Sequence, residues 1–190
     1  MNSKKRRPVK NQRPSLSRLQ RLRRVVSGAK RELAQERYNR RMEISWITPQ
    51  IGVGGAIWRE DRMVELVRLG VTHILNMQLE FDDRDLARPY DIPVCWVKVD
   101  DDYLPKPAIV LKPGLDFALE ALEKEESKLY IHCAAGIHRS PMMALAVLRA
   151  QGLSQTEAQE KIKTARVIAE FPDVYVQSVE KLIQQYSGKR

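Results

Sequence analysis

The chain contains 190 residues, of which 43% are hydrophobic and 30% are charged, a composition typical of an ordinary globular protein. This length suits one compact domain with an appendage. No run of 18 apolar residues occurs, which argues against an integral membrane segment, and two cysteines are too few for a disulfide scaffold. We therefore expect a reducing, cytoplasmic location, in which an important thiol would be present for its reactivity.

The net charge of +9 is unevenly distributed along the chain. Residues 1–41 contain fifteen Lys and Arg against two Glu, a net charge of +13, whereas residues 42–190 contain 18 basic and 22 acidic residues, a net charge of −4. This division predicts a basic N-terminal arm, residues 1–41, and a mildly acidic domain, residues 42–190. By charge alone, only the arm resembles a polyanion-binding segment.

The arm itself has two parts. Residues 1–15 contain almost no apolar side chains and are predicted to be disordered. From Leu16 to Leu33, apolar residues recur every three or four positions between arginines, which predicts an amphipathic helix within residues 16–38. Such a helix is typical of segments that bind RNA or an anionic membrane surface, and also of organelle transit peptides. The remaining interpretation is a solubilising tail whose helix packs on its own domain.

Beyond the arm, predicted strands and helices alternate. The expected strands are two short segments within 44–53, separated by Pro49, and then 71–77, 95–99 and 128–132. The expected helices are 58–69 ending at Gly70, 112–125 with Pro113 in its first turn, 141–152, 154–166 behind a Ser154–Glu157 capping box, and 173–186. Residues 80–94 are expected to form a loop or a short helix, and residues 100–107 a loop. The alternation predicts an α/β fold with a central, mainly parallel sheet flanked by helices.

The segment HCAAGIHRS, residues 132–140, connects a predicted strand to a predicted helix. A loop at this place turns backbone N–H groups inward and adds a helix N-terminus, which together form an anion site. Gly136 permits the tight turn, and the planar guanidinium of Arg139 can hold two phosphate oxygens. The same positive surroundings favour the thiolate of Cys133, the nucleophilic form, and Ser140 can donate a hydrogen bond to its sulfur.

This His-Cys-x2-Gly-x2-Arg-Ser sequence resembles the signature loop of the protein tyrosine phosphatase superfamily, in the form found in its dual-specificity branch. The similarity covers about residues 44–187, including ITPQIGVGG, LVRLGVTHILN and the terminal helices. The resemblance implies a dual-specificity phosphatase-like fold and a cysteine-dependent phosphatase, most simply one acting on phosphotyrosine or phosphoserine/threonine proteins. It also implies that neither a metal nor an organic cofactor is needed. The chain has no room for the tyrosine-recognition loop of longer members, which implies a shallow pocket.

The resemblance further assigns roles to the residues of the loop. Cys133 would attack phosphorus, Ser140 would help the thiolate depart, and His132 would orient the loop. Substrate oxygens would be held by the loop amides and the arginine, that is, by Ala134, Ala135, Gly136, Ile137, His138 and Arg139.

The family's general acid lies on a loop that follows a strand, about thirty residues before the cysteine. Here the strand 95–99 precedes Asp100, Asp101 and Asp102. The family's register selects Asp101 as the acid that protonates the leaving oxygen, with its two neighbours as alternatives.

Two further residues, Asn76 and Cys95, each have two possible roles. Asn76 matches a family position that braces the phosphate loop, but it could simply be a polar strand end. Cys95 could form a reversible disulfide with Cys133, as in some relatives, or could be a small buried residue.

Other functions fit parts of the sequence. Relatives act on phosphoinositides, phosphoglucans or RNA 5′-triphosphates, but loop positions 134, 135, 137 and 138 lack the lysines that are common in enzymes for inositol lipids. A non-catalytic phosphate-binding module would be expected to lack Cys133, Arg139 or the acid. Low-molecular-weight phosphatases place the loop and the acid in the reverse order. The three histidines and two cysteines show no zinc-ligand spacing.

Overall fold

The computed structural model describes residues 43–187, and all structural statements below concern this part of the chain. The basic arm, residues 1–41, and its predicted amphipathic helix lie outside the described residues. Within the described part, no helix combines the length and the apolar character needed to cross a bilayer.

Five strands form one mixed sheet in the order β1-β2-β5-β3-β4. The strands are β1 (Ile44–Trp46), β2 (Ile51–Gly54), β3 (His73–Gln78), β4 (Val94–Val99) and β5 (Leu129–His132). Only β1 is antiparallel to its neighbour, so the prediction of a mainly parallel sheet is confirmed. The register places Gly54 and Asn76 on either side of His132, at the end of the sheet where the HCAAGIHRS loop begins.

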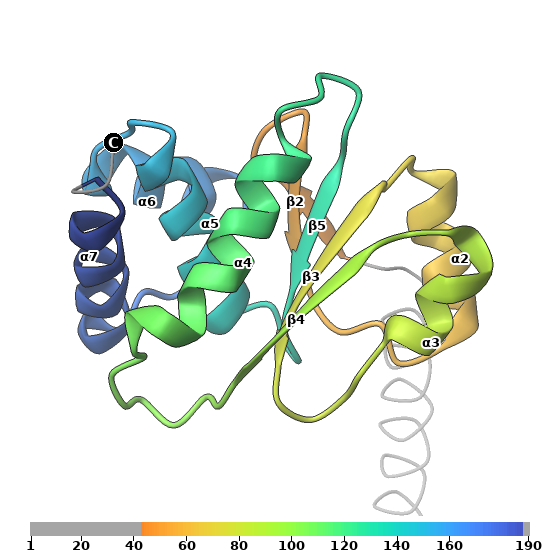
Figure 1. Cartoon of the computed structure of the whole chain (residues 1–190), viewed down its shortest axis with the longest axis horizontal. Helices are drawn as coiled ribbons and strands as arrows, with labels where there is room; N and C mark the ends of the chain where they lie inside the picture. Colours follow the sequence, from red (N-terminus) through yellow and green to blue (C-terminus); the bar gives the residue numbers. More distant parts are fainter. Residues whose placement is uncertain (1–42, 188–190) are drawn as a thin grey trace, which may run out of the picture. The chain divides into compact units, whose positions relative to one another are not determined.

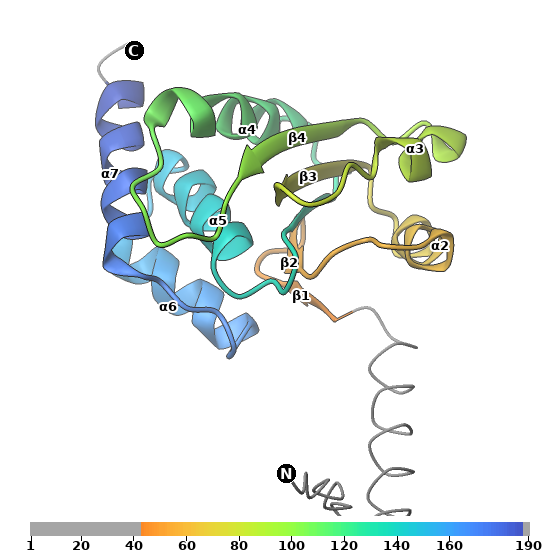
Figure 2. The same cartoon turned by 90° about the horizontal axis from the view of Figure 1, so that it is seen from below.

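Helices cover both faces of this sheet (Figures 1 and 2). One side carries α2 (Glu60–Arg68), α3 (Arg84–Ala87) and the 3-10 turn Arg88–Tyr90. The other side carries α4 (Ala108–Ala121), α5 (Arg139–Ala150), α6 (Gln155–Ala165) and α7 (Asp173–Ser187). The sheet therefore separates two apolar cores, a smaller one around Met63 and Leu66 of α2 and a larger one around α5.

Helix α5 is the central element of the larger core. Ten of its twelve residues are buried, including the first two, Arg139 and Ser140. A helix that is apolar nearly all round requires neighbours on every side, and α5 contacts the sheet as well as α4, α6 and α7. The loop that enters α5 is thereby anchored to the most densely packed part of the domain.

Several predicted boundaries are confirmed and two are wrong. The Ser154–Glu157 capping box begins α6, and Gly70 ends α2 with φ of +78°. Helix α4, however, begins at Ala108 rather than at residue 112, so Pro113 lies in its interior and cannot donate to the carbonyl four residues earlier. We attribute the early start to burial of Leu111 and Leu115 against the sheet, which offsets the cost of that proline.

The second boundary error concerns the helix expected at 141–152. Helix α5 begins two residues earlier, at Arg139. Arg139 and Ser140 are therefore residues of the first helical turn, fixed by the helix rather than by a flexible loop.

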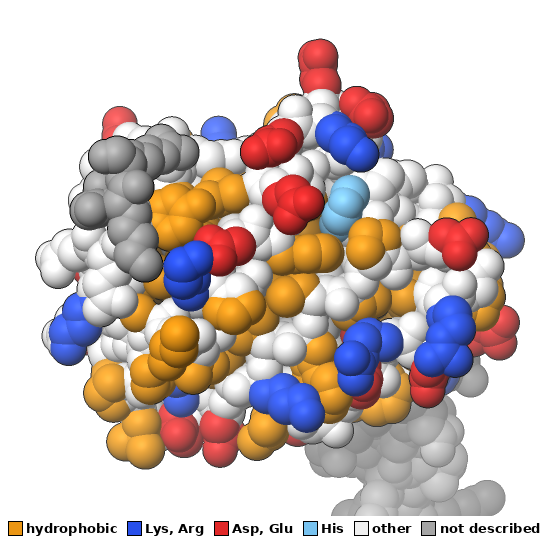
Figure 3. Space-filling model, viewed as in Figure 1, with side chains coloured by type: hydrophobic (Ala, Val, Ile, Leu, Met, Phe, Trp, Pro, Cys, Tyr) orange, Lys and Arg blue, Asp and Glu red, His pale blue; other side chains and the backbone are white. Residues whose placement is uncertain are grey.

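Exposed apolar side chains gather where β4 connects to α4. Tyr103, Leu104, Ile109 and Val110 are all exposed, with Ile109 at 78%. Figure 3 shows hydrophobic side chains over this connection and over α4, on the lower left of the view. This surface lies directly after the Asp100–Asp102 segment.

Candidate active site

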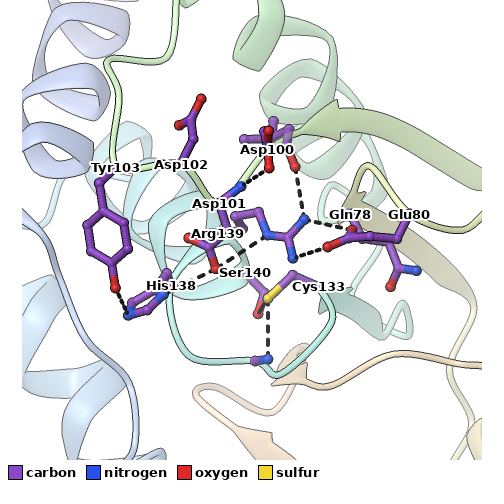
Figure 4. Close-up of polar contacts among 12 residues, drawn as sticks. Gln78, Glu80, Asp100, Asp101, Asp102, Tyr103, Cys133, His138, Arg139 and Ser140 are labelled. Carbon is purple, nitrogen blue, oxygen red and sulfur yellow. Dashed lines mark hydrogen bonds and ion pairs between the residues drawn. The ribbon is translucent and has the colours of Figure 1, made fainter. Parts of the chain in front are cut away.

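Cys133 occupies the first position of the loop between β5 and α5, at the inner end of the predicted site. Its side chain is 1% exposed, and the Gly136 N–H donates to Sγ at 3.2 Å (Figure 4). Ser140 Oγ lies 3.4 Å from the same sulfur and 3.3 Å from the Gly54 carbonyl oxygen. The sulfur thus lies beside a backbone donor and a hydroxyl group, in the place that the resemblance assigns to the nucleophile.

The carbonyl groups of the loop are bound from outside. Ala134 O accepts from the Ala56 N–H at 3.1 Å, and Ile137 O accepts from the Glu170 N–H at 2.8 Å. Arg166 donates to the two carbonyls between these, those of Ala135 at 3.2 Å and Gly136 at 2.5 Å. Because the N–H of each peptide points opposite to its C=O, the amides of residues 135–138 face away from these partners. This orientation makes the loop an anion cradle.

Gly136 has the backbone conformation that the sequence predicts. Its φ is +70°, a value that residues with side chains rarely adopt. A Cβ at this position would lie 2.6 Å from the backbone of Gly54. Both the turn and the close approach to β2 therefore require glycine.

Arg166 is a supporting residue that the sequence analysis missed. It lies at the end of α6 and is 4% exposed, and besides the loop carbonyls it donates to Glu43 O at 3.4 Å and Ser45 Oγ at 3.3 Å. One guanidinium thus joins the loop to the segment around β1. No local motif marks this arginine, because its partners lie at least 30 positions away in the chain.

We expect Arg166→Met to lower the rate of phosphate ester hydrolysis about tenfold and the free energy of unfolding by about 2 kcal/mol, because buried carbonyls lose their donors. Steady-state rates and urea unfolding would measure both changes. Arg166→Lys is the matched control: it keeps the charge but loses the fork that reaches several oxygens at once, so an intermediate loss is expected. Wild-type values for the Met variant would contradict this role.

His132 lies against a buried carboxylate. Its Nε2 lies 2.7 Å from Asp83 Oδ2, and both side chains are completely buried. Asn76 donates to Asp83 Oδ1 at 3.0 Å and to Phe81 O at 2.9 Å, while its Oδ1 accepts from the Gln78 N–H at 2.9 Å. Asn76 is therefore more than a polar strand end. It holds Asp83, whose carboxylate lies against the imidazole of His132 at the start of the loop, so any brace that Asn76 provides runs through Asp83.

Arg139 points into the site but has a partner that the sequence did not indicate. Its Nη1 and Nη2 donate to the two carboxylate oxygens of Glu80 at 2.8 and 2.9 Å, and Nη1 also donates to Val99 O at 2.9 Å. These hydrogen bonds lower the pKa of the Glu80 carboxyl. The buried Nε of Arg139 has no hydrogen-bond partner within the described chain, and it lies 3.7 Å from Asp101 Oδ2. Arg139 thus keeps one buried donor for a bound anion.

The three consecutive aspartates have different surroundings. Asp101 Oδ2 faces Arg139 Nε and His138 Nδ1, the latter at 3.2 Å. Asp102 instead pairs with Lys106, which lowers its pKa, and Asp100 Oδ1 accepts from the Asp101 N–H at 2.8 Å. Among the three, only Asp101 contacts side chains of the loop (Figure 4).

Cys95 lies apart from the loop. It pairs with Leu75 across β3 and β4, and Leu75 pairs with Ile131 on its other side. Two strand spacings, roughly 10 Å, therefore separate Cys95 from β5, more than a disulfide spans without backbone movement. Cys95 is half-buried against α4, and this burial raises the pKa of its thiol. The alternative of a disulfide with Cys133 is wrong for this conformation.

The fold and the loop geometry define an α/β domain with a cysteine at the centre of an anion cradle. Residues 59–179 match the family model described as "Dual specificity phosphatase, catalytic domain". The chain therefore belongs to the dual-specificity phosphatase family.

Individual relatives agree with this assignment. Dual specificity protein phosphatase 26 of Homo sapiens is 33% identical over 108 residues, which cover 55% of this chain and 51% of the relative. Dual specificity protein phosphatase 5 of Rattus norvegicus is 25% identical over 115 residues, 60% of this chain and 29% of the relative. The chain thus spans about half the length, or less, of these two relatives.

Solved structures share the fold. The crystal structure of PTPMT1 superposes with a TM-score of 0.68 at 19% identity, covering 77% of this chain and 98% of that one. The crystal structure of human DUSP28 has a TM-score of 0.65 at 22% identity, covering 76% and 95%. At these identities the similarity establishes the architecture and not the substrate.

Proposed function

We propose that residues 43–187 form a phosphatase that hydrolyses phosphate monoesters through a cysteinyl-phosphate intermediate. The observation that carries this proposal is the arrangement at Cys133: a buried sulfur with a backbone donor at 3.2 Å, in a loop whose carbonyls at residues 134–137 are held from outside. A thiolate in this place lies beside a phosphate bound to the loop amides.

The reaction proceeds in two displacements. In the first, the Cys133 thiolate forms a bond to phosphorus, the ester P–O bond breaks, and Asp101 gives its proton to the leaving oxygen. In the second, the Asp101 carboxylate takes a proton from water as the water oxygen attacks phosphorus, and the thiolate leaves with the help of Ser140. Loop amides and Arg139 Nε bind the three equatorial oxygens throughout.

We further propose phosphorylated proteins as the substrate class. The relatives named above are protein phosphatases by name. The exposed apolar residues Tyr103, Leu104, Ile109 and Val110 provide a surface next to the acid segment on which a polypeptide can pack. The loop also lacks lysines that would select a polyanionic inositol headgroup.

The test is a comparison of initial rates on phosphotyrosine and phosphothreonine peptides, a phosphoinositide, a phosphoglucan and an RNA 5′-triphosphate. We expect kcat/KM on one of the peptides to exceed that on every non-protein substrate. A higher value for the lipid, glucan or RNA would overturn the protein substrate but leave the phosphatase proposal intact. If the protein hydrolysed none of these substrates and no simple aryl phosphate, both the phosphatase proposal and the protein-substrate proposal would be overturned.

The basic arm, residues 1–41, has a proposed role of its own. We propose that residues 1–41 contact polyanions, RNA or an anionic membrane surface, because they carry a net charge of +13. Deleting them should leave the hydrolysis of a small aryl phosphate within about twofold and weaken retention on RNA or anionic vesicles, with a steep salt dependence in the full chain. Equal retention of both proteins would contradict this role, and loss of aryl phosphate hydrolysis would instead indicate that the arm belongs to the catalytic domain.

A further inference from the structure

The side chain of His138 lies between two carboxylates. Its Nδ1 is 3.2 Å from Asp101 Oδ2, and its Nε2 is 3.3 Å from the Tyr103 hydroxyl (Figure 4). The same Nε2 is 3.1 Å from Glu170 Oε2. The side chain is 14% exposed. A neutral imidazole has one N–H, whereas an imidazolium has two, so the protonated ring can donate to both carboxylates.

Glu170 is itself fixed on the phosphate loop. Its backbone N–H donates to Ile137 O at 2.8 Å, which places the segment between α6 and α7 beside His138. The imidazole is therefore contacted at Nε2 by residues other than Asp101, and one of them is attached to the loop through its own backbone.

The other oxygen of the Asp101 carboxyl is held by α7. Tyr175 donates its hydroxyl to Asp101 Oδ1 at 3.1 Å and accepts the N–H of Tyr103 at 3.0 Å. Burial, together with the Asp101 carboxyl, raises the pKa of Tyr175 to about 12, so the phenol stays a donor at neutral pH. Tyr103 has φ of +58°, an uncommon value for a residue with a side chain. This conformation is held by the hydrogen bond to Tyr175 and by stacking of the two rings at 6.0 Å.

We propose that His138 is a positioning residue for the acid: its imidazole joins the carboxyl of Asp101 to the phosphate loop, so that the acid is in place whenever the loop is occupied. This inference rests on the proposed function. Of the two groups on Oδ2, Arg139 Nε is the more distant at 3.7 Å, and it is also the donor left for substrate. His138 is therefore the contact on Oδ2 that remains when phosphate binds, while Tyr175 holds Oδ1.

Two substitutions of similar size separate this role from a general loop defect. The amide nitrogen of Asn can take the place of Nδ1, whereas that of Gln reaches the place of Nε2. We expect His138→Asn to retain the phosphopeptide rate within about threefold. His138→Gln should lower the rate on both substrates unequally: the loss on the phosphopeptide should be about ten times the loss on an aryl phosphate with an acidic leaving group. The reason is that only the phosphopeptide needs a proton donated to its leaving group. His73→Asn, at the start of β3, is the control and should alter neither rate.

A double variant shows whether His138 acts through Asp101. If it does, adding His138→Gln to Asp101→Asn causes no further leaving-group-dependent loss. Equal losses on both substrates, a Gln variant that matches the Asn variant, or additive losses in the double variant would each overturn the inference. The single variant Asp101→Asn tests the proposed function separately: if it shows no leaving-group dependence, the acid is misassigned, whatever His138 does.

Discussion

We expect Cys133→Ser to abolish turnover while leaving phosphate binding largely intact. A serine hydroxyl is not ionised near neutral pH and attacks phosphorus poorly, whereas the loop amides and Arg139 remain in place. We expect less than about a hundredth of the wild-type rate on a generic aryl phosphate. Phosphate or tungstate binding, measured by calorimetry, should stay within about threefold of the wild-type Kd.

The chain offers a matched control for this substitution. Cys95→Ser makes the same chemical change at a half-buried thiol roughly 10 Å from β5, and it should leave the rate unchanged. Residual activity of Cys133→Ser above about a hundredth of the wild-type rate would remove this cysteine as the nucleophile. An equal loss in both variants would point to a packing defect instead.

The second large effect is expected for Asp101→Asn. An amide cannot supply the proton that a poor leaving group requires, so the rate on phosphopeptides should fall about 100-fold. On an aryl phosphate whose leaving group is already a stable anion, the factor by which the rate falls should be about one tenth as large. A series of aryl phosphates with increasing leaving-group pKa measures this difference: the logarithm of the rate should fall more steeply with leaving-group pKa in the variant than in the wild type.

Asp100→Asn is the control for the acid. The new side chain keeps the oxygen that accepts the Asp101 N–H, and Asp100 contacts no side chain of the loop. A steeper leaving-group slope in Asp100→Asn or in Asp102→Asn, with none in Asp101→Asn, would show that the family's register is shifted by one residue in this chain.

The parts of the site that could be predicted from sequence are those encoded by neighbouring residues. The loop 132–140 carries its own turn glycine, nucleophile and arginine, and the Ser154–Glu157 capping box is likewise local. The choice of Asp101 among three aspartates came from the family's register, which counts from the end of the preceding strand, and it stays a prediction. In each case the chemistry and the geometry depend on positions only a few residues apart.

The contacts that the sequence did not indicate are long-range. Glu80 pairs with Arg139 across 59 positions, and Tyr175 reaches Asp101 across 74. A single glutamate or tyrosine in a chain of 190 residues has no pattern that marks such a partner. The start of α4 was missed for a related reason: burial against the sheet outweighs the local preference of Pro113 for a first turn.

The two strands before α2, β1 and β2, limit where this domain can be cut. The match to the family model begins at residue 59, yet Glu43, Ser45, Gly54 and Ala56 all hydrogen-bond to the phosphate loop or to Arg166. A fragment that starts at the family boundary would retain the nucleophile, the arginine and the acid but would lose β1 and β2 and the outer partners of the loop. We therefore expect the minimal catalytic unit to extend to residue 43, next to the basic segment, and a shorter fragment to be less active than the domain.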